Sequence, residues 1–172
     1  MPPTPPVDVF LSTWRADPGT IGALLVASIA YLGTVARMRR RGKSWPVRRT
    51  VGFFALGLLP YAVIELGFLG SYSSELRWAF STRIALLIFV IPAGVAAGRP
   101  LDLLPAGVRE RLLASRLTRI LGNAMVATIV IAAVFCLFLT PLAGILRVNP
   151  AVEASLGIVV PLVGLAMVLP MT

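Results

Sequence analysis

The sequence predicts an all-α integral membrane protein, a bundle of about five transmembrane helices. Of its 172 residues, 58% are hydrophobic and only 13% are charged, whereas a soluble domain carries about 25% charged residues. The apolar residues gather in runs long enough to cross a bilayer, and the basic residues cluster between these runs. We therefore expect residues 1–172 to form one membrane domain, a multi-pass protein of a bacterial plasma membrane.

Five apolar runs are expected to span the membrane. Residues 20–36 carry no charge and, at helical rise, extend about 26 Å, near the lower limit for a crossing. The remaining spans are expected at residues 50–70, 81–98, 122–142 and 154–171. The chain ends two residues after Pro170, which suggests a shortened relative of a longer protein.

The basic residues set the expected orientation. Seven lie in residues 37–49 and five in residues 99–119, whereas four lie elsewhere. Because cytoplasmic loops carry an excess of Lys and Arg, we expect the N-terminus outside and the C-terminus inside. Apolar residues recur at helical spacing over residues 108–121, which predicts a helix lying on the inner leaflet before the fourth span. A cytoplasmic extension of that span is the alternative.

Composition excludes several classes of function. The chain has no histidine and one cysteine, which rules out haem ligation by His, a Ser-His-Asp triad and any CxxC pair. The net charge of +9 would suggest nucleic acid in a soluble protein, but here the basic residues lie between apolar runs. We expect no nucleic-acid partner and no catalytic activity.

Glu65 and Arg83 are the charged residues that lie inside apolar runs. An ionisable group at membrane depth is a candidate functional site, and Tyr61 shares a helix face with Glu65 at i, i+4. Glu65 and Arg83 lie at similar depth on consecutive antiparallel spans, which predicts an ion pair. Its role is either a clasp between helices or a proton or cation site at Glu65; a snorkelling Arg83 beside a protonated Glu65 is the third option.

Small residues predict where helices approach one another. Gly94 and Gly98 form a GxxxG step in the third span, and a stripe at every fourth position follows the fourth span: Ala124, Thr128, Ala132, Cys136 and Thr140. Cys136 and the pair Met167 and Met171 carry sulfur atoms that suit Cu(I). Neither has a further ligand at a suitable spacing, so we expect packing roles, no metal site and no cofactor.

Several short motifs occur in an order that resembles a known family. They are Tyr31-Leu32, Gly42, Trp45-Pro46-Val47-Arg48-Arg49, Gly98-Arg99-Pro100 and Leu139-Thr140-Pro141-Leu142. This order resembles the CtaG-type cytochrome c oxidase assembly factors, especially actinobacterial ones. The resemblance implies a multi-span fold linked to copper supply for the oxidase.

The chain departs from that family at the presumed metal ligands. The family carries a His-Met-x-x-His motif near the start of the third span, where this chain has Phe80 to Leu87 with Arg83 among them. A later family histidine, near the fifth span, also has no counterpart. We therefore expect a scaffold or accessory protein of a respiratory complex, CtaG-like but without copper ligands, whose partners are membrane lipids and other membrane proteins. The alternative is a small transporter or proton- or ion-conducting protein that uses Glu65.

Overall fold

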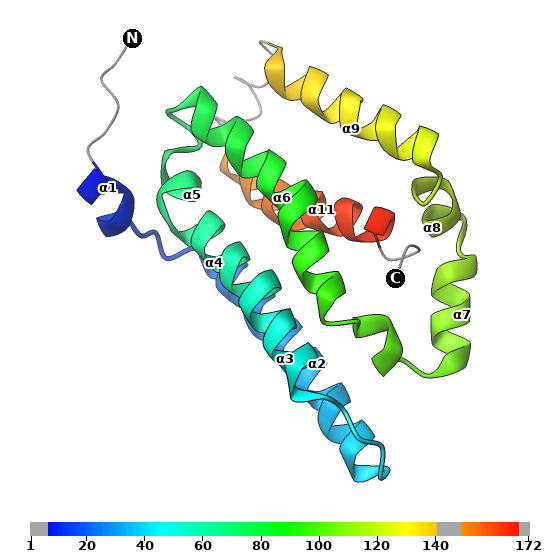
Figure 1. Ribbon diagram of the computed structural model, residues 1–172. Coiled ribbons are helices and arrows are strands. Elements are labelled where there is room, and N and C mark those ends of the chain that lie inside the picture. The colour runs from blue at the N-terminus through cyan, green and yellow to red at the C-terminus, as the bar shows by residue number, and fades with distance from the viewer. Residues whose placement is uncertain (1–6, 141–148, 169–172) are drawn as a thin grey trace.

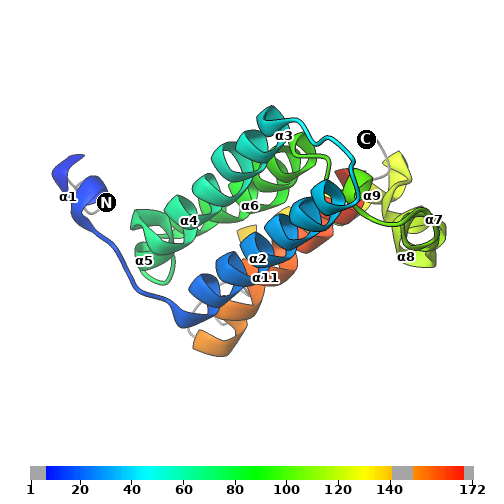
Figure 2. The same cartoon turned by 90° about the horizontal axis from the view of Figure 1, so that it is seen from below.

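The computed structural model describes residues 7–140 and 149–168, and within these ranges every regular element is helical (Figures 1 and 2). The all-α prediction is therefore confirmed for this part of the chain. The elements are α1 (Val7–Ser12), α2 (Pro18–Arg40), α3 (Val47–Gly52), η1 (Phe53–Leu58), α4 (Leu59–Leu66), α5 (Phe68–Tyr72), α6 (Arg77–Ala97), η2 (Pro100–Leu103), α7 (Ala106–Ala114), α8 (Arg116–Leu121), α9 (Ala124–Leu139) and α11 (Pro150–Val168).

Four helical stretches of the described residues are long and apolar enough to cross a membrane. They are Pro18–Arg40, Val47–Tyr72, Arg77–Ala97 and Ala151–Val168. They cover the expected spans 20–36 and 50–70 in full, 81–98 except for Gly98, which follows the end of its helix, and 154–171 except for residues 169–171, which lie outside the described residues. The expected span at 122–142 corresponds to α9, which has 16 residues, and residues 141 and 142 are not described. A fifth span and the N-out orientation stay predictions.

The second span is a chain of four shorter helical pieces. Phe53–Leu58 is a π-helical segment directly before Pro60, whose ring cannot follow an ordinary α-helical turn because it would clash with the carbonyl four residues earlier. The helix breaks again at Gly67, which has extended backbone. This break leaves the Leu66 carbonyl open to another partner, and the Arg15 backbone N–H donates to it at 2.7 Å.

The segment before α9 is not one interfacial helix. It forms η2, α7 and α8, separated at Leu104–Pro105 and at Ser115. Ser115 has extended backbone, and its hydroxyl accepts from the Thr118 N–H at 3.2 Å. A serine in this role starts a new helix, so the apolar stripe at 108–121 is divided between α7 and α8.

The α6 helix lies at the centre of the bundle. It packs against η1 and α4 on one side and against α11 on the other, while α2 contacts both α4 and α11. The two views show the same arrangement, with α9 at the edge of the molecule, reached through α7 and α8 (Figures 1 and 2). The main core lies between these helices, and its buried residues include Tyr61, Phe80, Ile84, Leu87 and Val160.

An aspartate starts α2. The Asp17 carboxylate accepts from the backbone N–H and the hydroxyl of Thr20 at 2.7 and 2.6 Å. The side-chain hydrogen bond from Thr20 lowers the pKa of Asp17, which stabilises its ionised form. This cap sets the first turn of α2 directly beyond the segment that carries Arg15.

Two glycines let α6 approach η1 closely. A methyl group at position 94 would collide with the Leu56 carbonyl, and one at position 98 would lie 2.6 Å from the Phe53 Cβ atom. Both glycines of the GxxxG step therefore face the π-helical segment. The carbonyl of Leu56, four residues before Pro60, lies against Gly94 at this contact.

We predict that Gly94→Ala destabilises the bundle, because the added methyl group must displace backbone rather than a flexible side chain. The expected loss in free energy of unfolding is about 1–3 kcal/mol or more. The matched control is Gly33→Ala in α2, where a Cβ meets no atom within 4 Å. Thermal unfolding in detergent measures both, and equal unfolding temperatures for the two variants would contradict the close contact between α6 and η1.

Candidate functional site

A buried arginine lies at the centre of the polar interior. Arg83 of α6 is 3% exposed and lies about 9 Å along the axis from the start of its helix. Its Nε donates to Glu65 Oε1 at 3.0 Å and its Nη2 donates to Glu65 Oε2 at 2.7 Å. This is a bidentate pair, the arrangement in which guanidinium and carboxylate bind most strongly. The sequence placed these two charges at similar depth, and the structure brings them together.

A second carboxylate reaches the same arginine from α11. Arg83 Nη1 donates to Glu153 Oε1 at 3.2 Å and to the Ser73 hydroxyl at 3.1 Å. The Ser73 oxygen also lies 2.5 Å from Glu153 Oε1 and 2.9 Å from the Gly70 carbonyl. We call Glu65, Ser73, Arg83 and Glu153 the ionic cluster. It joins α4, the turn before α6, α6 itself and α11.

The charges of the ionic cluster balance only with help from the N-terminal segment. Arg83 supplies one positive charge against the two carboxylates of Glu65 and Glu153. Arg15 lies at the rim, with its Nη1 3.9 Å from Glu153 Oε1 and half of its side chain exposed. The backbone of Arg15 is held by Leu66, so the segment between α1 and α2 brings the second positive charge to the site.

Tyr61 and Gly157 join the cluster to the apolar core. The Tyr61 hydroxyl donates to the Gly157 carbonyl at 3.1 Å, which links α4 to α11. A Cβ at Gly157 would lie 2.9 Å from Glu65 Oε2 and 3.3 Å from Arg83 Nη2. Glycine at this position therefore lets the backbone of α11 lie directly against the ion pair.

The arrangement is suited to holding helices together rather than to binding a cation. Both Glu65 oxygens accept from Arg83, and a guanidinium at the centre repels a metal ion. The oxygen donors are also hard ligands, which Cu(I) disfavours. Among the described residues there is no group of three or more His, Cys, Asp or Glu side chains placed to hold a metal ion.

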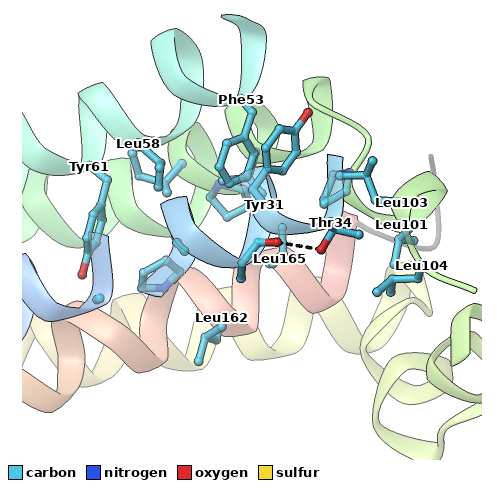
Figure 3. A pocket seen from close by; sticks show the side chains of 18 of the residues that line it. Tyr31, Thr34, Phe53, Leu58, Tyr61, Leu101, Leu103, Leu104, Leu162 and Leu165 are labelled. Carbon is cyan, nitrogen blue, oxygen red and sulfur yellow. Dashed lines mark hydrogen bonds between the residues drawn. The ribbon is translucent and has the colours of Figure 1, made fainter. Parts of the chain in front are cut away.

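An apolar cavity of about 460 Å³ extends from Tyr61 toward the other end of the bundle (Figure 3). Its walls come from α2, α6, α11 and the η2 segment, and Leu162 and Leu165 line the α11 side. The Thr34 hydroxyl at the wall donates to the Ala30 carbonyl at 2.6 Å. Its lining is apolar apart from two tyrosines and this threonine, so the cavity suits a hydrocarbon chain rather than a polar substrate.

Three of the motifs that carried the family resemblance, those at Tyr31, Trp45 to Arg49 and Gly98 to Pro100, meet at the end of the bundle away from the ionic cluster. The Tyr31 hydroxyl donates to the Gly98 carbonyl at 3.1 Å, and its ring stacks on Phe53 with centroids 3.9 Å apart. The Arg49 guanidinium lies 5.0 Å from the centre of the Trp45 ring and pairs with Asp102 at 3.2 Å. These residues join α2, α3 and the end of α6.

The small-residue stripe of α9 faces outward in the described structure. Thr128, Ala132, Cys136 and Thr140 are all exposed, and the surroundings of the Ala124 side chain lie outside what the structure describes. Met167 is buried, whereas Met171 lies outside the described residues. Cys136 and Met167 therefore lie in different environments.

Sequence reasoning missed two members of the ionic cluster, Glu153 and Ser73. Glu153 lies in the first turn of α11, where a charged residue ordinarily indicates the water-facing end of a span. Its spacing of i, i+4 to Gly157 places both on one helix face, but only the packing of α11 on α6 turns that face toward Arg83. Ser73 lies in a turn, and its sequence neighbourhood carries no signal of this contact.

Comparison with known proteins identifies the family. Residues 29–172 match the family described as cytochrome c oxidase caa3 assembly factor (Caa3_CtaG). The chain belongs to this family. The matched range includes Tyr31, Arg49 and Gly98 at the basic end of the bundle. It also includes all four residues of the ionic cluster.

Two curated proteins are also similar to this chain. Uncharacterized protein Mb0105 of Mycobacterium bovis and uncharacterized protein MT0111 of Mycobacterium tuberculosis are each 28% identical over 157 residues. The alignment covers 83% of this chain and 24% of each relative, so the chain spans about a quarter of their length. No solved structure matches the chain with comparable significance.

We predict that the ion pair is a coupled unit. Glu65→Leu removes the bidentate partner of Arg83, and Arg83→Leu leaves the Glu65 carboxylate buried without its guanidinium. Each variant is expected to lower the free energy of unfolding by about 3–5 kcal/mol. The double variant Glu65→Leu, Arg83→Leu removes both charges and should be more stable than the sum of the single losses predicts. Unfolding in detergent measures the cycle, and strict additivity would show that the two residues act independently.

Proposed function

We propose that this chain is a non-catalytic membrane scaffold that acts in the assembly of a cytochrome c oxidase-type respiratory complex. Membership of the caa3 assembly factor family supports the oxidase as partner. The observation that carries the scaffold role is the bidentate pair of Arg83 and Glu65, because it occupies the third-span region where the family resemblance implies metal-binding histidines. In this proposal the chain holds no copper of its own and works through contacts with other membrane proteins.

We propose that the chain is a multi-pass protein of the bacterial plasma membrane. Four helices of spanning length support it, with α9 as the fifth crossing. The arginines of residues 37–49 and 99–119 then face the cytoplasm by the positive-inside rule. The ionic cluster lies at the opposite end of the bundle, toward the outer leaflet.

The geometry favours a scaffold over an ion-conducting protein. A conducting site needs a carboxylate that can release Arg83 to accept a proton or cation, but both Glu65 oxygens are bound at 3.0 and 2.7 Å. The Tyr61 hydroxyl is likewise held by the Gly157 carbonyl. The exposed face of α9, with Ala132 and Cys136 on it, is instead of the kind that packs against a neighbouring helix.

An affinity-tagged chain purified in mild detergent from the membranes of its own organism should carry oxidase subunits in stoichiometric amount. Ala132→Phe, on the small-residue face of α9, should reduce the recovered oxidase several-fold. Val26→Phe is the matched control, since Val26 of α2 is 69% exposed and enlarging it alters only the lipid-facing surface.

The opposite result would be a stable homo-oligomer that carries no oxidase and conducts protons in vesicles, with the flux abolished by Glu65→Gln. That result would exclude the scaffold role and favour proton conduction as the function of this chain. If Ala132→Phe and Val26→Phe reduced the recovered oxidase equally, the α9 face would be excluded as the contact surface. The oxidase would remain the proposed partner.

A further inference from the structure

A second pocket lies at the end of the bundle where the basic residues gather. Its volume is about 520 Å³, and it is lined by Pro46, Arg48, Arg49, Ala97 and Arg99. The walls come from the start of α3 and the end of α6. Three of the five lining residues are arginines, so the pocket presents guanidinium groups from two helices to whatever enters it. We call it the arginine pocket.

The positive charge around the arginine pocket exceeds the negative charge. Asp102 is the carboxylate at this place, and it lies 3.2 Å from Arg49, 4.0 Å from Arg99 and 3.4 Å from Arg109. Arg48 has no ion pair among the described residues. Three arginines therefore share the Asp102 carboxylate, and Arg48 beside them has no carboxylate partner in the described part of the chain. An anion in the pocket would relieve the repulsion between these arginines.

The backbone holds this charge arrangement in place. Arg99 has left-handed backbone with φ of 47°, a conformation that non-glycine residues adopt only where the surrounding structure imposes it. Its carbonyl accepts from the Asp102 N–H at 3.1 Å. Arg49 is fixed between Asp102 and the Trp45 ring. Two of the three arginines are thus positioned before any ligand arrives.

The arginine pocket opens onto a surface suited to hydrocarbon. Val90, Ala93 and Ala97 lie at i, i+3 and i+7 of α6 and are all exposed, so they form one apolar face that leads away from the pocket along the span. Gly52 of α3 faces Ala97 at its edge, since a Cβ there would lie 3.9 Å from the Ala97 carbonyl oxygen. A ligand with a charged head and an apolar tail fits both parts.

We propose that the arginine pocket binds the phosphate headgroup of one anionic phospholipid, whose acyl chains lie on the exposed face of α6. Arg48 and Arg99 donate to the phosphate oxygens, because guanidinium groups match the geometry of phosphate. The pocket lies at the ends of two helices of spanning length, which is the level of lipid headgroups. Basic pockets between spans on the cytoplasmic side are sites where anionic lipids bind, so the inference rests on the proposed orientation but not on the oxidase as partner.

Native mass spectrometry of the purified full chain can count bound lipids. Phosphatidylglycerol is the probe, and phosphatidylcholine and inorganic phosphate are the comparisons, at about 0.15 M salt. We expect phosphatidylglycerol to bind more tightly than phosphatidylcholine, and Arg48→Gln, Arg99→Gln together to weaken it by at least about tenfold. The control is Arg40→Gln, Arg41→Gln, which removes the same charge from exposed residues outside the pocket and should weaken binding about twofold or less.

Three results would overturn the proposal. Equal weakening in the two double variants would mean diffuse electrostatic attraction rather than a pocket. Inorganic phosphate that displaces phosphatidylglycerol at similar concentration would mean a site for a soluble anion. Equal binding of phosphatidylglycerol and phosphatidylcholine by the native chain would mean no headgroup selectivity, and this comparison needs no variant to fold. Loss of oxidase co-purification with lipid binding intact would overturn the proposed function alone.

Discussion

The need to neutralise Arg83 inside the bundle determines how its central helices are arranged. A guanidinium buried in an apolar environment is destabilising unless carboxylates and hydrogen-bond acceptors surround it. Glu65 supplies two acceptors at 3.0 and 2.7 Å, and Glu153 and Ser73 supply the third and fourth contacts. These partners come from separate elements, so α4, α6 and α11 must meet at one depth. Glycine at position 157 then allows α11 to lie against the pair.

The two ends of the bundle are stabilised by different interactions. At the ionic cluster the charges are buried and directional, and they fix the relative rotation of three helices. At the basic end, Asp102 joins three arginines that are all partly exposed, where water and salt screen the charges and each pair contributes little stability. Tyr31, which stacks on Phe53 and donates to Gly98, supplies the packing contact that the exposed charges do not.

The sequence predicted features that depend on composition and helical rise. The lengths of the apolar runs located four spanning helices, and counting depth along the second and third spans placed Glu65 and Arg83 at one level. Glu153 was not predicted as their partner, because nothing in the sequence shows that α11 is the helix that packs on α6. The division of residues 99–121 at Ser115 was also missed, since the apolar stripe continued through it and the local cap decided the break.

The state of Glu65 tests the account most directly. If Arg83 holds it as a clasp, both Glu65 oxygens accept hydrogen bonds from the guanidinium, as those of a carboxylate do. Infrared absorption of the full chain labelled with ¹³C-glutamate, compared with Glu65→Gln, isolates the bands of this one residue. The clasp predicts that the lost bands are those of a carboxylate. Loss of a protonated carboxylic acid band would contradict the clasp and point to a proton-carrying site.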